Sequence, residues 1–126
     1  MKPLNKIIIN KDTSFNPIWI MRQAGRYLPE FREIRKKNPD FINLCLNDYL
    51  SSEITLQPLK RYDIDAAIIF SDILMLPYGL GQKVKFEKNF GPKLDNLDLN
   101  EIAKKDEVDF VEKIYPVYKA IKKASF

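Results

Sequence analysis

The fold class of this chain is decided by one stretch, IDAAIIFSDIL at residues 64–74. Residues 66–70 are apolar throughout, include β-branched isoleucines and show no alternation with polar residues. That pattern is typical of a strand buried on both faces, as in a parallel sheet that helices cover. Helical patterns precede and follow the stretch, so we predict an α/β fold with Asp72 just beyond the carboxyl end of a central strand.

A second strand is predicted at residues 18–21, and the loop RQAGR at residues 22–26 follows it. Arg22 and Arg26 carry planar guanidinium groups, which suit carboxylates or phosphates. Ala24 and Gly25 are small enough to let a ligand approach the backbone and its N–H groups. The loop therefore indicates an anion-binding site, although charge pattern alone favours the simpler interpretation of two surface arginines.

The remaining segments predict helices joined by turns. Residues 1–16 read as a polar leader, and Asn47 and Asp106 are predicted helix caps. Pro116 interrupts the last helical pattern, so we expect a break near Tyr115. Helices are expected at residues 29–37, 40–46, 48–62, 73–80, 99–104 and from 107 onward, and a small hairpin at 83–94.

Composition excludes several classes of protein and site. The 126 residues are 45% hydrophobic and 30% charged, as expected of a soluble globular protein. The net charge of +4 is compatible with acidic ligands, but the lysines are scattered among acids, which argues against nucleic-acid binding. The chain has no histidine, which excludes Ser-His and Cys-His catalysis and histidine metal sites within it.

Cys45 is the only cysteine, so no internal disulfide can form and a reducing compartment is expected. Its apolar neighbours predict a buried thiol rather than a nucleophile. No apolar run approaches membrane-spanning length. The sequence therefore predicts a cytoplasmic protein that does not bind membranes.

Two segments carry a resemblance to a known family. The segment PIWIMRQAGRYLPEF at residues 17–31 closely resembles the N-terminal motif of uroporphyrinogen decarboxylase, and residues 64–74 resemble its second motif. The resemblance runs from about Pro17 to the C-terminus. It implies a (β/α)8 TIM barrel, which typically needs ~250 residues. Residues 17–126 are thus expected to form the N-terminal part of an incomplete barrel, with the hairpin as an insertion.

The resemblance also implies an activity and roles for named residues. The family's enzymes are homodimeric carboxy-lyases of haem and chlorophyll biosynthesis that convert uroporphyrinogen III to coproporphyrinogen III without a metal or organic cofactor. Asp72 matches the aspartate that binds the pyrrole N–H groups, and Arg22 and Arg26 match the arginines that hold substrate carboxylates. Arg22 also matches a proposed proton donor. The backbone of the loop, at Gln23, Ala24 and Gly25, is expected to contact the porphyrinogen.

Three alternatives stay open at this point. Asp72 could be an ordinary helix N-cap, because an apolar helical run follows it. The chain could be a truncated, inactive remnant that binds anions, because the tyrosine, serine or threonine, and histidine of later family strands have no counterpart here. A cobalamin-dependent methyltransferase is disfavoured, because those enzymes use histidine and cysteine zinc ligands and lack the RQAGR loop.

Overall fold

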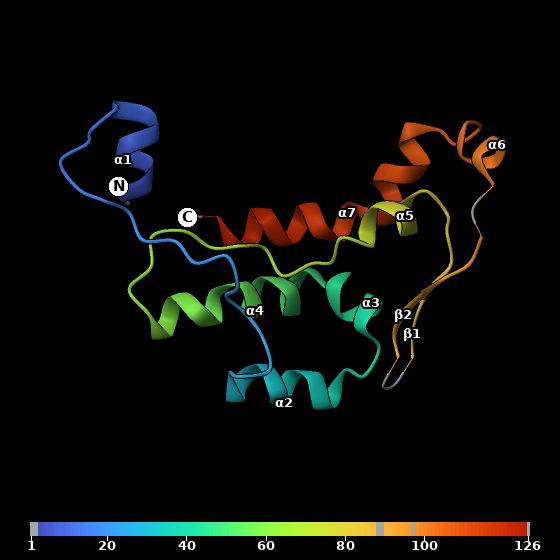
Figure 1. Cartoon of the computed structure of the whole chain (residues 1–126), viewed down its shortest axis with the longest axis horizontal. Helices are drawn as coiled ribbons and strands as arrows, with labels where there is room; N and C mark the ends of the chain where they lie inside the picture. The colour runs from blue at the N-terminus through green and yellow to red at the C-terminus, as the bar shows by residue number, and fades with distance from the viewer. Residues whose placement is uncertain (1–2, 88–89, 97, 126) are drawn as a thin grey trace.

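The computed structural model describes residues 3–87, 90–96 and 98–125. Its centre is helix α4, which lies between α2 and α7 (Figure 1). The hairpin β1–β2 extends from one side, and α1 stands apart near the N-terminus (Figure 1). The elements in chain order are α1 (Pro3–Asn10), α2 (Pro29–Lys37), α3 (Phe41–Cys45), α4 (Asp48–Arg61), α5 (Met75–Gly79), β1 (Val84–Glu87), β2 (Gly91–Leu94), α6 (Leu99–Ile102) and α7 (Glu107–Ala124).

The helix starts follow from their capping residues. The Asn47 side chain accepts a hydrogen bond from the Leu50 amide at 3.0 Å and so begins α4. Asp106 begins α7 in the same way, and Pro29 occupies the first turn of α2, where its missing N–H costs nothing. The predictions of caps at Asn47 and Asp106 are confirmed.

The prediction of two parallel strands, at residues 18–21 and 66–70, is wrong. Residues 18–21 and 66–70 run without helix or sheet, and the only sheet of the described residues is the antiparallel pair β1–β2, which joins Val84 to Leu94 and Glu87 to Gly91. A strand is defined by the ladder it forms with neighbours. One backbone hydrogen bond near them runs from the Asp65 amide, just before the second segment, to the Ile18 carbonyl at 2.9 Å, and a single bond does not make a ladder.

A further expectation, the break near Pro116, needs correction. Helix α7 runs through Pro116 without the break expected near Tyr115, because a proline removes one helical hydrogen bond and can bend a helix instead of ending it. The polar leader at residues 1–16 contains the helix α1, none of whose residues is buried. Within the residues that the structure describes, no helix combines the length and the apolar character needed to cross a membrane.

The segment at residues 64–72 passes between the helices and joins two small cores. Phe70 packs against both clusters, and its ring meets those of Phe31 and Phe41 edge-on at centroid distances of 5.6 and 5.8 Å. Such offset aromatic contacts stabilise a core beyond the area they bury. One cluster contains Leu28, Phe31, Leu44 and Ile54, and the other contains Ile42, Cys45 and Met75.

The thiol of Cys45 should be almost inert in the folded protein. Its side chain is fully buried, as predicted, and burial together with the nearby charge of Asp72 raises its pKa to about 12. Since the thiolate is the reactive form, a disulfide reagent at pH 8 should modify Cys45 about 100-fold more slowly than in 6 M guanidinium. Equal rates in the two solutions would contradict this burial.

Candidate active site

The RQAGR loop is closed by its own backbone and by the residues that follow it. The Leu28 amide donates to the Gly25 carbonyl at 3.0 Å, and the Tyr27 hydroxyl donates to the Gln23 carbonyl. Leu28 is 1% exposed and belongs to the core below α4, so it anchors the end of the loop. The loop is therefore a fixed turn at the surface rather than a free tether.

Two arginines outside the loop support it, Arg32 directly and Arg61 through α2, and sequence reasoning missed both. Arg32 donates to the carbonyls of Arg26 and Tyr27 at 2.9 and 3.1 Å. Arg61, at the end of α4, forms a two-bond ion pair with Glu30 at 2.6 and 2.8 Å. These guanidinium groups are used within the chain and join α2 to the loop and to α4.

Arg22 and Arg26 differ from that pair. Both are exposed, and no hydrogen bond or ion pair among the described residues uses either side chain. The Arg26 carbonyl is held by Arg32, and both guanidinium groups are exposed, so both can receive a carboxylate from outside. This arrangement suits the predicted anion site.

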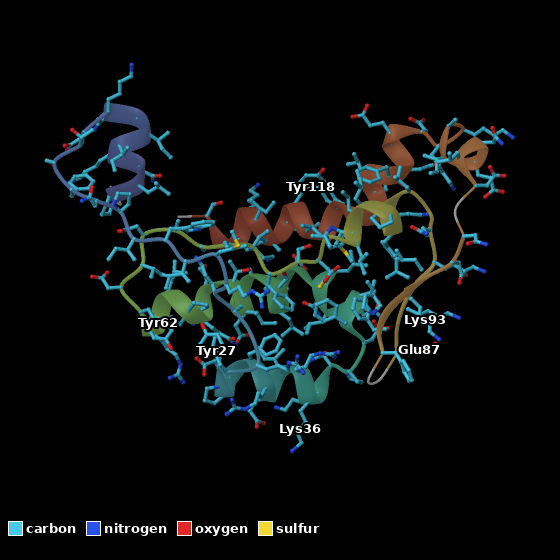
Figure 2. All side chains as sticks on the ribbon, viewed as in Figure 1. Tyr27, Lys36, Tyr62, Glu87, Lys93 and Tyr118 are labelled. Atoms are coloured by element: carbon cyan, nitrogen blue, oxygen red, sulfur yellow. The ribbon has the colours of Figure 1, made fainter. Side chains whose placement is uncertain are left out.

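A hollow of about 170 Å³ lies beside Arg22. Tyr27 and Tyr62 form part of its wall and lie near the last turn of α4 (Figure 2). Burial, followed by the proximity of Tyr62, raises the pKa of Tyr27, so its hydroxyl keeps the proton that it donates to the loop. The hollow is smaller than the pockets that enclose whole ligands, about 300–1,000 Å³, and suits one arm of a larger molecule.

Gln23 links the loop to the segment that leads to Asp72. Its side chain is 4% exposed; its Nε2 donates to the Ala66 carbonyl at 2.8 Å and its Oε1 accepts from the Ile68 amide at 2.9 Å. Nearby, the Ile18 amide donates to the Asp65 carboxylate at 2.7 Å. The two motifs found in the sequence therefore lie side by side.

Asp72 lies in the turn before α5. Its Oδ1 accepts a hydrogen bond from the Leu74 amide at 2.8 Å, and its carbonyl accepts from the Met75 amide at 3.0 Å. Asp72 is therefore not the N-cap of α5, which begins after Leu74 without a side-chain cap. What remains of the N-cap alternative is a turn-capping role, because the Asp72 side chain caps the turn that precedes the helix. No hydrogen bond in the described part of the chain uses Oδ2, so that oxygen can still accept one from a ligand.

The predicted site residues are spread along α4. Arg22 shares its hollow with Pro58 and Tyr62, at the end of α4, whereas the charge of Asp72 acts on Cys45, just before α4 begins. No hydrogen bond or ion pair among the described residues joins the Asp72 side chain to Arg22 or Arg26. A ligand that touches these groups together has to be wide and multiply charged. In the described ranges, no three His, Cys, Asp or Glu side chains gather as a metal site.

Comparison with known proteins identifies the family. The family model for uroporphyrinogen decarboxylase (URO-D) matches residues 1–125. The chain belongs to the URO-D family. It is 46% identical over 115 residues to the uroporphyrinogen decarboxylase of Agrobacterium fabrum, which is 91% of this chain and 33% of that protein. The enzyme of a Chelativorans species is 49% identical over 107 residues, 85% of this chain and 31% of its own. The chain spans about a third of the length of the curated relatives it matches.

The ion pair of Glu30 with Arg61 should make the stability of this URO-D chain fall in acid. The hydrogen bonds from Arg61 lower the pKa of Glu30 from 4.5 to about 2. The contribution is thus complete above about pH 4.5 and is lost as the pH falls toward 2. Glu30→Gln should remove this part of the pH dependence, measured as urea midpoints between pH 7 and 3.

The effect should be modest, because the pair is partly exposed to water. Glu33→Gln is the matched control, since Glu33 is an exposed acid of the same helix with no ion pair among the described residues. A Glu30→Gln variant whose midpoints track those of the unmodified protein at every pH would show that the pair contributes nothing.

Proposed function

We propose that this protein acts as a uroporphyrinogen decarboxylase, a carboxy-lyase that removes the acetate carboxylates of uroporphyrinogen III to give coproporphyrinogen III. The observation that carries the proposal is the loop with two exposed arginines, held beside the segment that leads to Asp72, in a chain of the URO-D family. The proposal covers the whole protein, since the chain spans about a third of its curated relatives.

The chemistry proposed for Asp72 is electrostatic. Loss of carbon dioxide leaves an electron pair that needs a sink, and a pyrrole protonated on a ring carbon supplies one. A fixed carboxylate beside the pyrrole N–H groups stabilises the positive charge as it develops, so no metal or organic cofactor is needed. The contact from the Leu74 amide holds Oδ1, and Oδ2 remains available for the pyrrole N–H groups.

The chemistry proposed for the loop is recognition. Arg22 and Arg26 would hold the acetate and propionate arms and select the acetate that reacts, together with backbone N–H groups at Gln23, Ala24 and Gly25. The hollow beside Arg22 has room for one such arm. We do not assign the proton-donor role to Arg22, because a guanidinium group holds its proton tightly and is a poor acid.

We also propose that residues 17–126 are the first part of a TIM barrel, with the β1–β2 hairpin inserted near the mouth. Side chains pair one edge of residues 66–70, whereas no hydrogen bond in the described residues uses the backbone of Ala67 or Ile69. Those two residues line a hollow of about 550 Å³ with Ile121. The backbone groups of Ala67 and Ile69 are thus available to pair with another strand. A central strand of a parallel sheet has such a second neighbour. A homodimer in the cytoplasm completes the proposal.

The competing proposal is a remnant that binds porphyrinogens without turnover. The two separate when the whole open reading frame that contains this sequence is expressed and incubated with uroporphyrinogen III. Chromatography of the oxidised products should show coproporphyrin if the enzyme proposal is right. Binding of the porphyrinogen without coproporphyrin would favour the remnant.

Asp72 is tested by two substitutions in that protein. Asp72→Asn keeps size but removes the charge, so turnover should fall by ~10²-fold or more while the melting temperature stays close to that of the unmodified enzyme. Asp72→Glu keeps the charge and should retain more activity than Asp72→Asn. The turn-capping alternative predicts the reverse, because asparagine caps as well as aspartate. A stable, fully active Asp72→Asn enzyme would end the catalytic assignment.

Arg26 is tested by affinity. Arg26→Ala should weaken porphyrinogen binding by roughly 1.5–3 kcal/mol if it removes one charge-assisted contact, and Arg22→Ala should reduce both binding and turnover. Lys36→Ala is the control for loss of positive charge, since Lys36 points away from α4 into solvent (Figure 2). Binding and steady-state constants that match Lys36→Ala for both arginine variants would refute the anion loop.

A further inference from the structure

We propose that the Gln23 side chain is a positioning residue that sets the arginine loop in register with the segment leading to Asp72. This inference rests on the proposed decarboxylase function and adds a residue to it. The amide reaches across 43 and 45 residues of chain and uses its donor on Ala66 and its acceptor on Ile68. An amide that pairs with the C=O and N–H on one edge of an extended segment does the work of a neighbouring strand.

The same edge is held further along by α4. Ser51 donates its hydroxyl to the Phe70 carbonyl at 2.5 Å, and Thr55 accepts from the Phe70 amide at 2.7 Å. Residues 66, 68 and 70 are therefore fixed against their partners, and Asp72 follows two residues after Phe70, at the start of the turn before α5. A shift by one residue would turn this edge away from its partners and move the carboxylate.

The burial of the Gln23 side chain favours a positioning role over direct contact with substrate. Gln23 is 4% exposed and both polar atoms of its side chain are in use, so a substrate contact would have to break two hydrogen bonds. The loop arginines, by contrast, are exposed. The Gln23 side chain therefore acts on catalysis through the relative placement of Arg22, Arg26 and Asp72, where small displacements cost rate.

The test compares Gln23→Met with Gln82→Met in the protein made from the whole open reading frame. Methionine keeps the length of glutamine and loses both hydrogen bonds. Gln82 is the matched control, because its side chain also donates to a backbone carbonyl, that of Asp95, but beside the hairpin. Gln23→Asn is the conservative variant, since it keeps the amide and shortens its reach by one methylene.

Two readouts decide the outcome. In Gln23→Met, hydrogen exchange at the Ile68 amide should be about 10-fold faster, with the Phe70 amide changed less because Thr55 still holds it. At a temperature where all variants remain folded, kcat should fall by about 10-fold with little change in KM, and Gln23→Asn should lie between Gln23→Met and the unmodified enzyme. Gln82→Met should change neither Ile68 exchange nor kcat.

Two results would overturn the positioning role. One is faster Ile68 exchange with unchanged kcat, which makes the bond purely structural. The other is a raised KM with unchanged Ile68 exchange, which makes Gln23 a substrate ligand. If the unmodified protein shows no turnover, the proposed function fails on its own. The link that Gln23 makes between the loop and residues 66–68 is then judged by hydrogen exchange alone. Faster exchange of the Ile68 amide in Gln23→Met supports this link, and equal exchange refutes it.

Discussion

The structure depends on how one edge of the backbone at residues 66–70 is paired between the helices. Buried peptide groups need hydrogen-bond partners, and this segment has no sheet to supply them. It uses side chains instead: the amide of Gln23 and the hydroxyls of Ser51 and Thr55 pair with Ala66, Ile68 and Phe70. Those polar groups could be placed in a core only because each has a partner there, and each bond ties the segment to α4 or to the arginine loop.

Local features of the fold were predictable because their causes are local. The caps at Asn47 and Asp106 and the proline that opens α2 act within a few residues, and the helices begin where those signals stand. The strands were not predictable in the same way. Residues 66–70 have the composition of a strand, but a strand also needs a neighbouring strand to pair with. The sequence of the segment alone does not determine that neighbour. The two motifs, at residues 17–31 and 64–74, nevertheless lie side by side in the structure.

In the candidate site too, some residues could be predicted from the sequence and others could not. The exposed arginines and Asp72 were predicted from the two sequence motifs. The groups that hold them were missed. Arg32 reads as one more charge on an amphipathic helix, and only the fold reveals that it binds the carbonyls of Arg26 and Tyr27. A signal that could have found it is the clustering of arginines around the loop, in excess of what carboxylate recognition needs.

The four arginines near the loop divide between two tasks for a physical reason. A polyanionic ligand is bound best by cations whose backbone is already fixed, because less ordering entropy is lost on binding. Arg32 and Arg61 contribute to this rigidity because their guanidinium groups bind other groups of the chain. Glu30 offsets the charge of Arg61. In the proposed function, the donors of Arg22 and Arg26 are then left for the ligand. The loop thus gathers positive charge on a rigid turn without burying any unpaired arginine, which would cost far more than an exposed pair returns.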